Sequence, residues 1–279
     1  MTRLAYYSDL HLEGSNAILS PGAAGVVAVV GDVMAPPVGQ RLDNPEDEHE
    51  AVWWLRQHIP EDRVVLYVPG NHDYEGTRVS HALAAMRRAA QGSHVHVLWN
   101  EAVTIDGVRY IGSPLWSDPT QGREDPTAVL EAVALGTDLR RARRDDGRPL
   151  DGAWLLEQHG RARAFIAQEL AQHRDMTTVV LTHWAPSVRS QDAQFSALDK
   201  GGYWACDCED LVGQAHVWIH GHIHESVDYR VGNDPARGRV LSNPRGFSRL
   251  FNVAQNNAFD PTGRELVLPG PAAVRKARP

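Results

Sequence analysis

Cysteine is scarce in this chain of 279 residues, which contains only Cys206 and Cys208. A single residue separates the two, and a disulfide across so short a spacing would be strained. Two thiols cannot staple a small secreted scaffold, so a disulfide-rich extracellular domain is excluded. We expect both thiols to be reduced and structural, in a cytoplasmic protein.

Long apolar runs and a leader-like beginning are also lacking. No stretch approaches the roughly 18 consecutive apolar residues of a membrane span. The first residues, MTRLAYYSDLH, lack the basic region, apolar stretch and small-residue cleavage site of a secretory signal. We therefore expect a soluble, cytoplasmic protein with no membrane partner.

A surplus of positive charge is missing as well. The formal net charge is −7 and the isoelectric point is about 6.0, and lysine occurs only at positions 200 and 276. This balance excludes broad, non-specific binding to nucleic acids or membranes, although it leaves a local basic groove open. The hydrophobic content of 42% is that of an ordinary globular protein, and the chain is long enough for a substantial core.

The sequence does contain five short apolar runs, each followed by a cluster of polar residues. Short β-branched runs bounded by glycine or proline predict buried strands, and α/β sheets place their sites at the carboxyl ends of such strands. The runs are RLAYY (3–7), GVVAVV (25–30), RVVLYV (63–68), TTVVL (177–181) and AHVWI (215–219).

Between and after these runs, the apolar spacing predicts the remaining elements. Helices are expected over 45–59, 80–90 and 153–173, and strands over 95–116 around an Asp-Gly turn. The polar segment 117–150 is expected to form an excursion with one helix near 127–144, as a cap or rim. Two further strands are expected in SVDYRVG and GRVLSNPRGF. We predict one domain over 1–268 and a poorly ordered tail over 269–279.

The polar residues at the strand ends share one ligand chemistry. Aspartate, histidine and asparagine suit manganese, iron or zinc. They are too numerous for one ion with three or four protein ligands, whereas two ions about 3.5–4 Å apart, bridged by a carboxylate, would use them. The residues are Asp9, His11, Asp32, Asn71, His72, Asp73, His183, His222 and His224.

These residues occur in an ordered set of short motifs: Asp9-Leu-His11, Gly31-Asp32, Gly70-Asn71-His72-Asp73, His183, and Gly221-His222-Ile-His224. The set resembles that of the calcineurin-like metallophosphoesterase superfamily, and the resemblance spans residues 9 to 224. It implies an α/β fold of two mixed β-sheets packed face to face with helices on both outer sides, in four layers. It also implies a metal-dependent phosphoric ester hydrolase.

Carried over residue by residue, the resemblance assigns two metal sites and a leaving-group histidine. Asp32 would bridge both ions, and His72, oriented by Asp73, would assist the leaving group. Asp9, His11 and His224 would complete one site; Asn71, His183 and His222 would complete the other. The implied cofactors are two divalent ions, with manganese favoured over iron or zinc.

The implied mechanism is in-line attack on phosphorus by a metal-bridging hydroxide, without a phospho-enzyme. The segments GDVMAPP and GNHD lack the arginine and glutamate of the superfamily's Ser/Thr protein phosphatases. The chain is therefore closer to small bacterial phosphodiesterase-like and phosphohydrolase members. We favour a small-molecule phosphodiester as the substrate.

Several alternatives remain open from sequence alone. The same residues would serve a phosphomonoesterase of small phosphorylated molecules, or a nuclease, which the acidic charge disfavours. A non-catalytic scaffold binding a protein partner is the third, although such a protein would be expected to lose ligand residues. Arg189 and Arg245 are candidates to contact a phosphate, and His220 has no assigned role. The oligomeric state is open.

Overall fold

The structure is a computed structural model. It describes residues 1–120, 136–191, 202–247 and 254–269, together with the single positions 127, 129, 133 and 134. The helix predicted near 127–144 lies partly outside these ranges, and the tail predicted for 269–279 lies outside them beyond residue 269.

The first β-sheet has five strands in the order β11-β1-β2-β3-β4. Strands β1 to β4 are mutually parallel, and β11 adds to the edge of the sheet antiparallel to β1. Its strands are β1 (Thr2–Tyr7), β2 (Val26–Val30), β3 (Val64–Val68), β4 (Val95–Val97) and β11 (Leu266–Leu268).

The second β-sheet has six strands in the order β5-β6-β7-β8-β10-β9. The four central strands are parallel, and the edge strands β5 and β9 are antiparallel to their neighbours. Its strands are β5 (Glu101–Ile105), β6 (Val108–Ser113), β7 (Thr177–Thr182), β8 (Val217–His220), β9 (Asp228–Arg230) and β10 (Arg239–Ser242).

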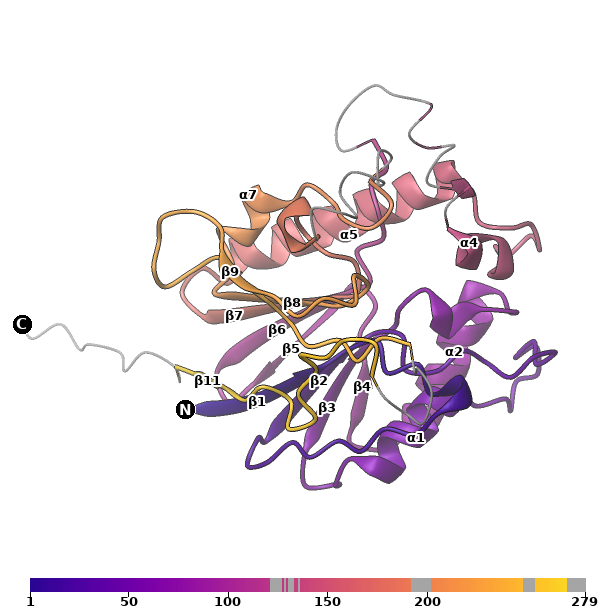
Figure 1. Ribbon diagram of the computed structural model, residues 1–279, viewed down its shortest axis with the longest axis horizontal. Coiled ribbons are helices and arrows are strands. Elements are labelled where there is room, and N and C mark those ends of the chain that lie inside the picture. The colour runs from indigo at the N-terminus through magenta and orange to yellow at the C-terminus, as the bar shows by residue number, and fades with distance from the viewer. Residues whose placement is uncertain are drawn as a thin grey trace, which may run out of the picture.

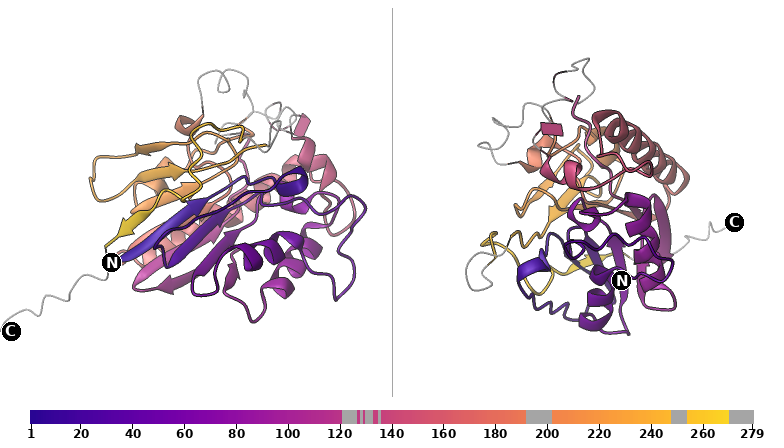
Figure 2. Two further views of the ribbon diagram at one scale, coloured as in Figure 1. Left: turned by 60° about the horizontal axis from the view of Figure 1, so that its bottom comes forward. Right: turned by 90° about the vertical axis from the view of Figure 1, so that its right-hand side faces the viewer.

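The two sheets pack face to face and helices cover their outer sides. One buried cluster joins inward-facing side chains of both sheets, such as Val30 and Leu66 from the first and Leu181 and Ile219 from the second. Figure 1 shows α1 and α2 below the first sheet and α5 and α7 above the second, and the turned views of Figure 2 agree. The four-layer α/β fold predicted from the sequence is confirmed.

The helices follow the predicted pattern with one shift. The described α-helices are α1 (Glu50–His58), α2 (Val79–Ala90), α4 (Thr137–Arg141), α5 (Gly152–Gln172) and α7 (Glu209–Val212). Helix α1 begins five residues later than predicted, because the ring of His49 accepts a hydrogen bond from the backbone N–H of Ala51 and caps the helix there. No helix within the described ranges combines the length and apolar character needed to cross a bilayer.

All five apolar runs form strands, so the polar residues that follow each run gather at one end of the two sheets. Short turns continue several of these strands: η1 (Leu12–Gly14) after β1, η2 (His72–Tyr74) after β3 and η3 (Val188–Ser190) after β7. Strand β11 was not anticipated, because three residues are too few to show a period.

Candidate metal centre

The loops that follow β1, β2, β3, β7 and β8 bring the predicted ligands together. Three groups of side chains offer ligand atoms within 4.8 Å of one another, and they overlap through His11 and Asp32. The groups are Asp9, His11 and His224; His11, Asp32 and His72; and Asp32, His183 and His222. The overlap makes one continuous centre rather than three separate sites.

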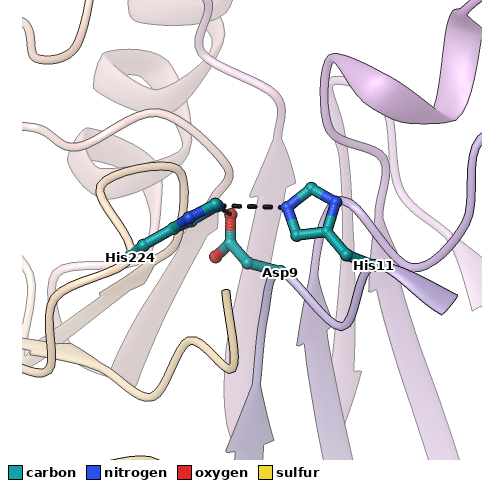
Figure 3. A group of neighbouring side chains, drawn as sticks. All are labelled: Asp9, His11 and His224. Atoms are coloured by element: carbon teal, nitrogen blue, oxygen red, sulfur yellow. Dashed lines mark hydrogen bonds and ion pairs between the residues drawn. The ribbon is translucent and has the colours of Figure 1, made fainter. Parts of the chain in front are cut away.

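The first group joins residues that are far apart in the sequence. The Nε2 atoms of His11 and His224 lie 3.1 Å apart, and the Oδ1 atom of Asp9 lies 3.3 Å from the His224 nitrogen. Figure 3 shows the two imidazoles reaching toward each other from opposite sides, with the Asp9 carboxylate between them. A ligand atom from each residue therefore faces one common point.

Asp32 lies between this group and the next. Its Oδ2 atom is 3.9 Å from Nε2 of His11 and 3.2 Å from Nε2 of His183. On the far side, Oδ1 of Asn71 lies 2.8 Å from the same His183 nitrogen. Asp32 is thus positioned to share its carboxylate between two ligand groups.

The donor atoms of these residues suit divalent ions. One of them, in His222, gives direct support for a bound ion. Nε2 of His222 is buried and has no hydrogen-bond partner within the described ranges. A buried polar atom without a partner is costly, and native proteins rarely leave one so. Because this nitrogen belongs to the group with Asp32 and His183, a metal ion there would satisfy it.

Hydrogen bonds to the Nδ1 atoms of two predicted ligand histidines fix the orientation of their rings. Nδ1 of His183 donates to the carbonyl of Val30 at 2.9 Å, and Nδ1 of His224 lies 3.0 Å from Oε1 of Gln255. With Nδ1 occupied in this way, Nε2 of each ring is left to point into the centre. Such outer partners are a regular feature of histidines that bind metals.

The backbone of the centre is strained. Five of the seven predicted ligand residues adopt left-handed φ angles between 45° and 68°: Asp9, His11, Asp32, His222 and His224. Such angles are uncommon outside glycine, and each costs about 1–3 kcal/mol unless the surrounding fold enforces it. Their concentration here shows that the fold holds these side chains against local preference, as functional sites often require.

Two glycines leave room for the ligands. Gly31 has a φ of +92°, and a Cβ atom there would lie 2.1 Å from Nδ1 of His183. Gly70 has no left-handed φ, yet a Cβ atom there would lie 2.3 Å from Oδ1 of Asp32. Gly70 is therefore required by its close approach to a ligand rather than by a tight turn.

The charges of the centre suit cation binding. Burial alone would raise the pKa of Asp9, but its hydrogen bond to His224 and the nearby histidine charges lower it to about 2. Burial would also raise the pKa of Asp32, but the charges of His183 and His72 hold it well below its ordinary value. Burial lowers the pKa of His222 well below its usual range, so that ring is neutral and its nitrogen is available as a ligand.

His72 lies at the solvent side of the centre, with 20% of its side chain exposed. Its Nδ1 atom lies 2.8 Å from Oε1 of Glu75, which directly follows the turn η2. Glu75 in turn accepts hydrogen bonds from Arg141 at 3.0 and 3.2 Å. Sequence reasoning missed Glu75, and its one signal is the three-residue spacing that a 3-10 turn places on one side.

Asp73 does not occupy the position expected for it. Its two fully buried oxygens accept hydrogen bonds at 2.7 to 3.2 Å from the backbone N–H groups of Asp32, Val33, Met34 and Gly70. Burial and the charge of Asp32 raise its pKa to about 7. The carboxylate that pairs with His72 Nδ1 is therefore that of Glu75, while Asp73 ties together the loops that carry Asp32 and Asn71.

Replacing Asp73 with alanine should lower the free energy of unfolding by about 3–5 kcal/mol, because four buried N–H groups would lose their acceptor. Urea unfolding of the metal-free protein measures this. Asp151→Ala is the control, since Asp151 caps α5 through one bond to Trp154 and pairs with Arg144 near the surface, and its loss should cost only about 1 kcal/mol. Equal losses in the two variants would contradict the role given to Asp73.

The two arginines considered for phosphate contact lie elsewhere. Arg245 is buried, and its guanidinium donates to the carbonyls of Leu10 and Asn16 and to the hydroxyl of Ser15. Arg189 lies over the ring of Tyr229, 4.8 Å from its centroid. Arg245 thus braces the loop after β1, and Arg189 packs on Tyr229.

His220, the histidine without an assigned role, belongs to a buried hydrogen-bonded chain. Burial lowers its pKa to about 4, so the ring is neutral. Its Nδ1 donates to the carbonyl of Gly221 at 2.9 Å, so Nε2 must accept from the hydroxyl of Ser190 at 2.9 Å. Tyr229 then donates to Ser190 at 2.8 Å. His220 therefore links the end of β8 to the turn η3.

The two cysteines pack away from the predicted ligands. Both are buried, and Sγ of Cys206 donates to the carbonyl of Trp116 at 3.1 Å and lies 3.7 Å from Nδ1 of His159. Cys208 directly precedes α7. Hydrogen bonding to Cys206, then to His159, lowers the pKa of Cys208 to about 5.

The comparisons with known proteins bear on the fold alone. The chain is similar to a crystal structure of phosphopantetheinyl hydrolase (PptH) from Mycobacterium tuberculosis, with 19% identity and a TM-score of 0.59 over 88% of this chain and 90% of that one. A second solved chain matches at 13% identity with a TM-score of 0.48, covering 87% and 90% of the two chains. No family model matches this sequence, and no curated protein does either. The protein thus shares its architecture with PptH.

Proposed function

We propose that this chain is a metal-dependent phosphoesterase that holds two divalent ions. The observation that carries the proposal is the continuous centre of His and Asp groups joined through Asp32 and His11. The fold shared with a phosphopantetheinyl hydrolase supports it. Two bound ions would supply Lewis acidity for the phosphoryl oxygens and lower the pKa of water.

The proposed ligands lie on two sides of Asp32, and each side would hold one ion. Asp9, His11 and His224 would hold one ion, and Asn71, His183 and His222 the other. Asn71 contributes a neutral oxygen, which leaves more positive charge on its side for a phosphate. Manganese is our first choice of metal, because oxygen and imidazole ligands both suit it.

His72 is the residue that we expect to act on the leaving group. Its Nδ1 pairs with Glu75, so the proton for a departing alkoxide must come from Nε2. Glu75 favours the charged imidazolium, and Arg141 holds Glu75 in place. The chain Arg141–Glu75–His72 would therefore keep a general acid at the mouth of the centre.

We favour a small-molecule phosphodiester over a monoester. A monoester carries an extra negative charge and would call for more cationic side chains than a diester does. The two arginines considered from sequence are engaged elsewhere, Arg245 with backbone carbonyls and Arg189 over Tyr229. A nucleic acid is not favoured, because the net charge of the chain is −7.

Hydrolysis of paired aryl substrates tests the proposal. Protein stripped of metal and then loaded with manganese should hydrolyse bis(p-nitrophenyl) phosphate faster than p-nitrophenyl phosphate, and the stripped protein should hydrolyse neither. Faster release from the monoester would overturn the diester preference. Absence of turnover with manganese, iron and zinc alike would overturn the proposal as a whole.

Replacing Glu75 with glutamine should lower kcat on an alkyl phosphate ester roughly tenfold, since the general acid loses its charged partner. Metal content and kcat on an aryl ester, which needs no proton, should change little. Asp43→Asn removes the same kind of pair from His81 and is the matched control. An equal fall on alkyl and aryl esters would show that Glu75 does not act through His72.

A further inference from the structure

A large aromatic side chain lies partly exposed on the metal centre. The ring of Phe247 stacks on His11, with the ring centroids 4.1 Å apart and the planes 30° from parallel. Its edges meet His72 at 5.7 Å and His224 at 5.0 Å between centroids. Phe247 thus contacts three of the imidazoles that form the centre.

The ring is nevertheless open to solvent on part of its surface. Phe247 is 48% exposed, whereas His11, on which it stacks, is 2% exposed. Single exposed apolar side chains are ordinary on protein surfaces. This one differs because His11 covers one of its faces, and the remaining area is presented beside the histidine proposed as the general acid.

The position of Phe247 is fixed by hydrogen bonds that also involve a predicted metal ligand. Its backbone N–H donates to Oε1 of Gln255 at 3.1 Å, and the N–H of Gln255 donates to the Phe247 carbonyl at 3.1 Å. The same Oε1 atom lies 3.0 Å from Nδ1 of His224. Gly246, with a φ of +72°, brings the chain close to both Gln255 and His224. These bonds therefore hold the Phe247 ring in a fixed position beside the predicted ligand His224.

We propose that Phe247 is a specificity-determining residue that stacks on the aromatic group of the substrate. This rests on the proposed function, because His72 places the leaving group beside the ring. The substrate would be a phosphate ester of an aromatic alcohol or phenol. Aromatic pairs gain stabilisation beyond the area they bury, so the platform discriminates a flat ring from a saturated ring of similar size.

Binding of two phosphinates that cannot be hydrolysed tests this directly. Benzyl(methyl)phosphinate and cyclohexylmethyl(methyl)phosphinate each carry one negative charge, as a phosphodiester does, and differ only in the ring. Calorimetric titration of the manganese-loaded protein should give a Kd about tenfold lower for the benzyl compound. Phe247→Leu, which keeps an apolar side chain without a π face, should abolish the preference, and Phe247→Trp should keep it.

Equal affinities of the two compounds for the unaltered protein would overturn the proposal. A preference that persists in Phe247→Leu, or absence of binding by both compounds, would overturn it too. Because the readout is equilibrium binding, it stands apart from the proposed function. A protein that prefers the benzyl compound yet hydrolyses no ester would contradict the phosphoesterase and leave the aromatic platform intact.

Discussion

Replacing Asp32 with asparagine should remove both metal ions and lower hydrolysis at least about 1,000-fold. Among the described residues, Asp32 is the carboxylate that belongs to a group with His11 and also to the group with His183, at 3.9 and 3.2 Å from their Nε2 atoms. The amide is neutral and a weaker ligand, so neither ion would keep its full charge balance. Elemental analysis of the desalted variant measures the metal content.

The matched comparison is Asp9→Asn, which removes the charge of a ligand proposed for one ion alone. The carboxylate of Asp9 also accepts the backbone N–H of His222 at 3.0 Å, and an asparagine oxygen can keep that bond. Asp9 lies 3.3 Å from His224 and belongs to no group with His183 or His222. This variant should keep one ion, whereas Asp32→Asn should keep none. Two tightly held ions in the Asp32 variant, or the same loss in both variants, would contradict a bridging role for Asp32.

Replacing His72 with alanine should lower kcat on an alkyl phosphate ester about 100- to 10,000-fold, the range that general acids supply. Substrates with a p-nitrophenolate leaving group should lose far less, because that group departs without a proton. Both metal ions should remain, since His72 belongs to neither proposed set of ligands. Initial rates on the two kinds of ester, with metal content measured alongside, give the result.

His81→Ala provides the control for His72, because His81 is a partly exposed histidine on α2 that also pairs with a carboxylate. It should leave rates on both esters unchanged. Loss of a metal ion from His72→Ala would be a different outcome with a clear meaning. It would make His72 a ligand together with His11 and Asp32, with which it forms one of the three groups.

The strands and the gathering of the polar residues could be predicted from sequence for a simple physical reason. Buried parallel strands need continuous β-branched runs, and these runs are visible in the letters of β1, β2, β3, β7 and β8. Because β1 and β2 are parallel neighbours, their carboxyl ends lie together and bring Asp9 close to Asp32, while the packing of the two sheets brings His183 to them from β7. The packing of the strands as two face-to-face sheets came from the resemblance rather than from the pattern.

The finer features of the site could not be predicted in this way. Asp73 and Glu75 differ in role because the turn η2 directs one carboxylate to the backbone and the other to His72, and a sequence does not show where a short turn points its side chains. Arg141, which holds Glu75, comes from the polar excursion, 66 residues further along the chain. Likewise, the left-handed backbone at Asp9 or His222 is imposed by tertiary packing against local preference.

Anomalous diffraction from crystals of the manganese-loaded protein tests the central claim most directly. Two peaks about 3.5–4 Å apart are expected, with Asp32 between them. One should lie among Asp9, His11 and His224, and the other among Asn71, His183 and His222. A single peak, or a pair of peaks in which the Asp32 carboxylate contacts only one ion, would contradict the account.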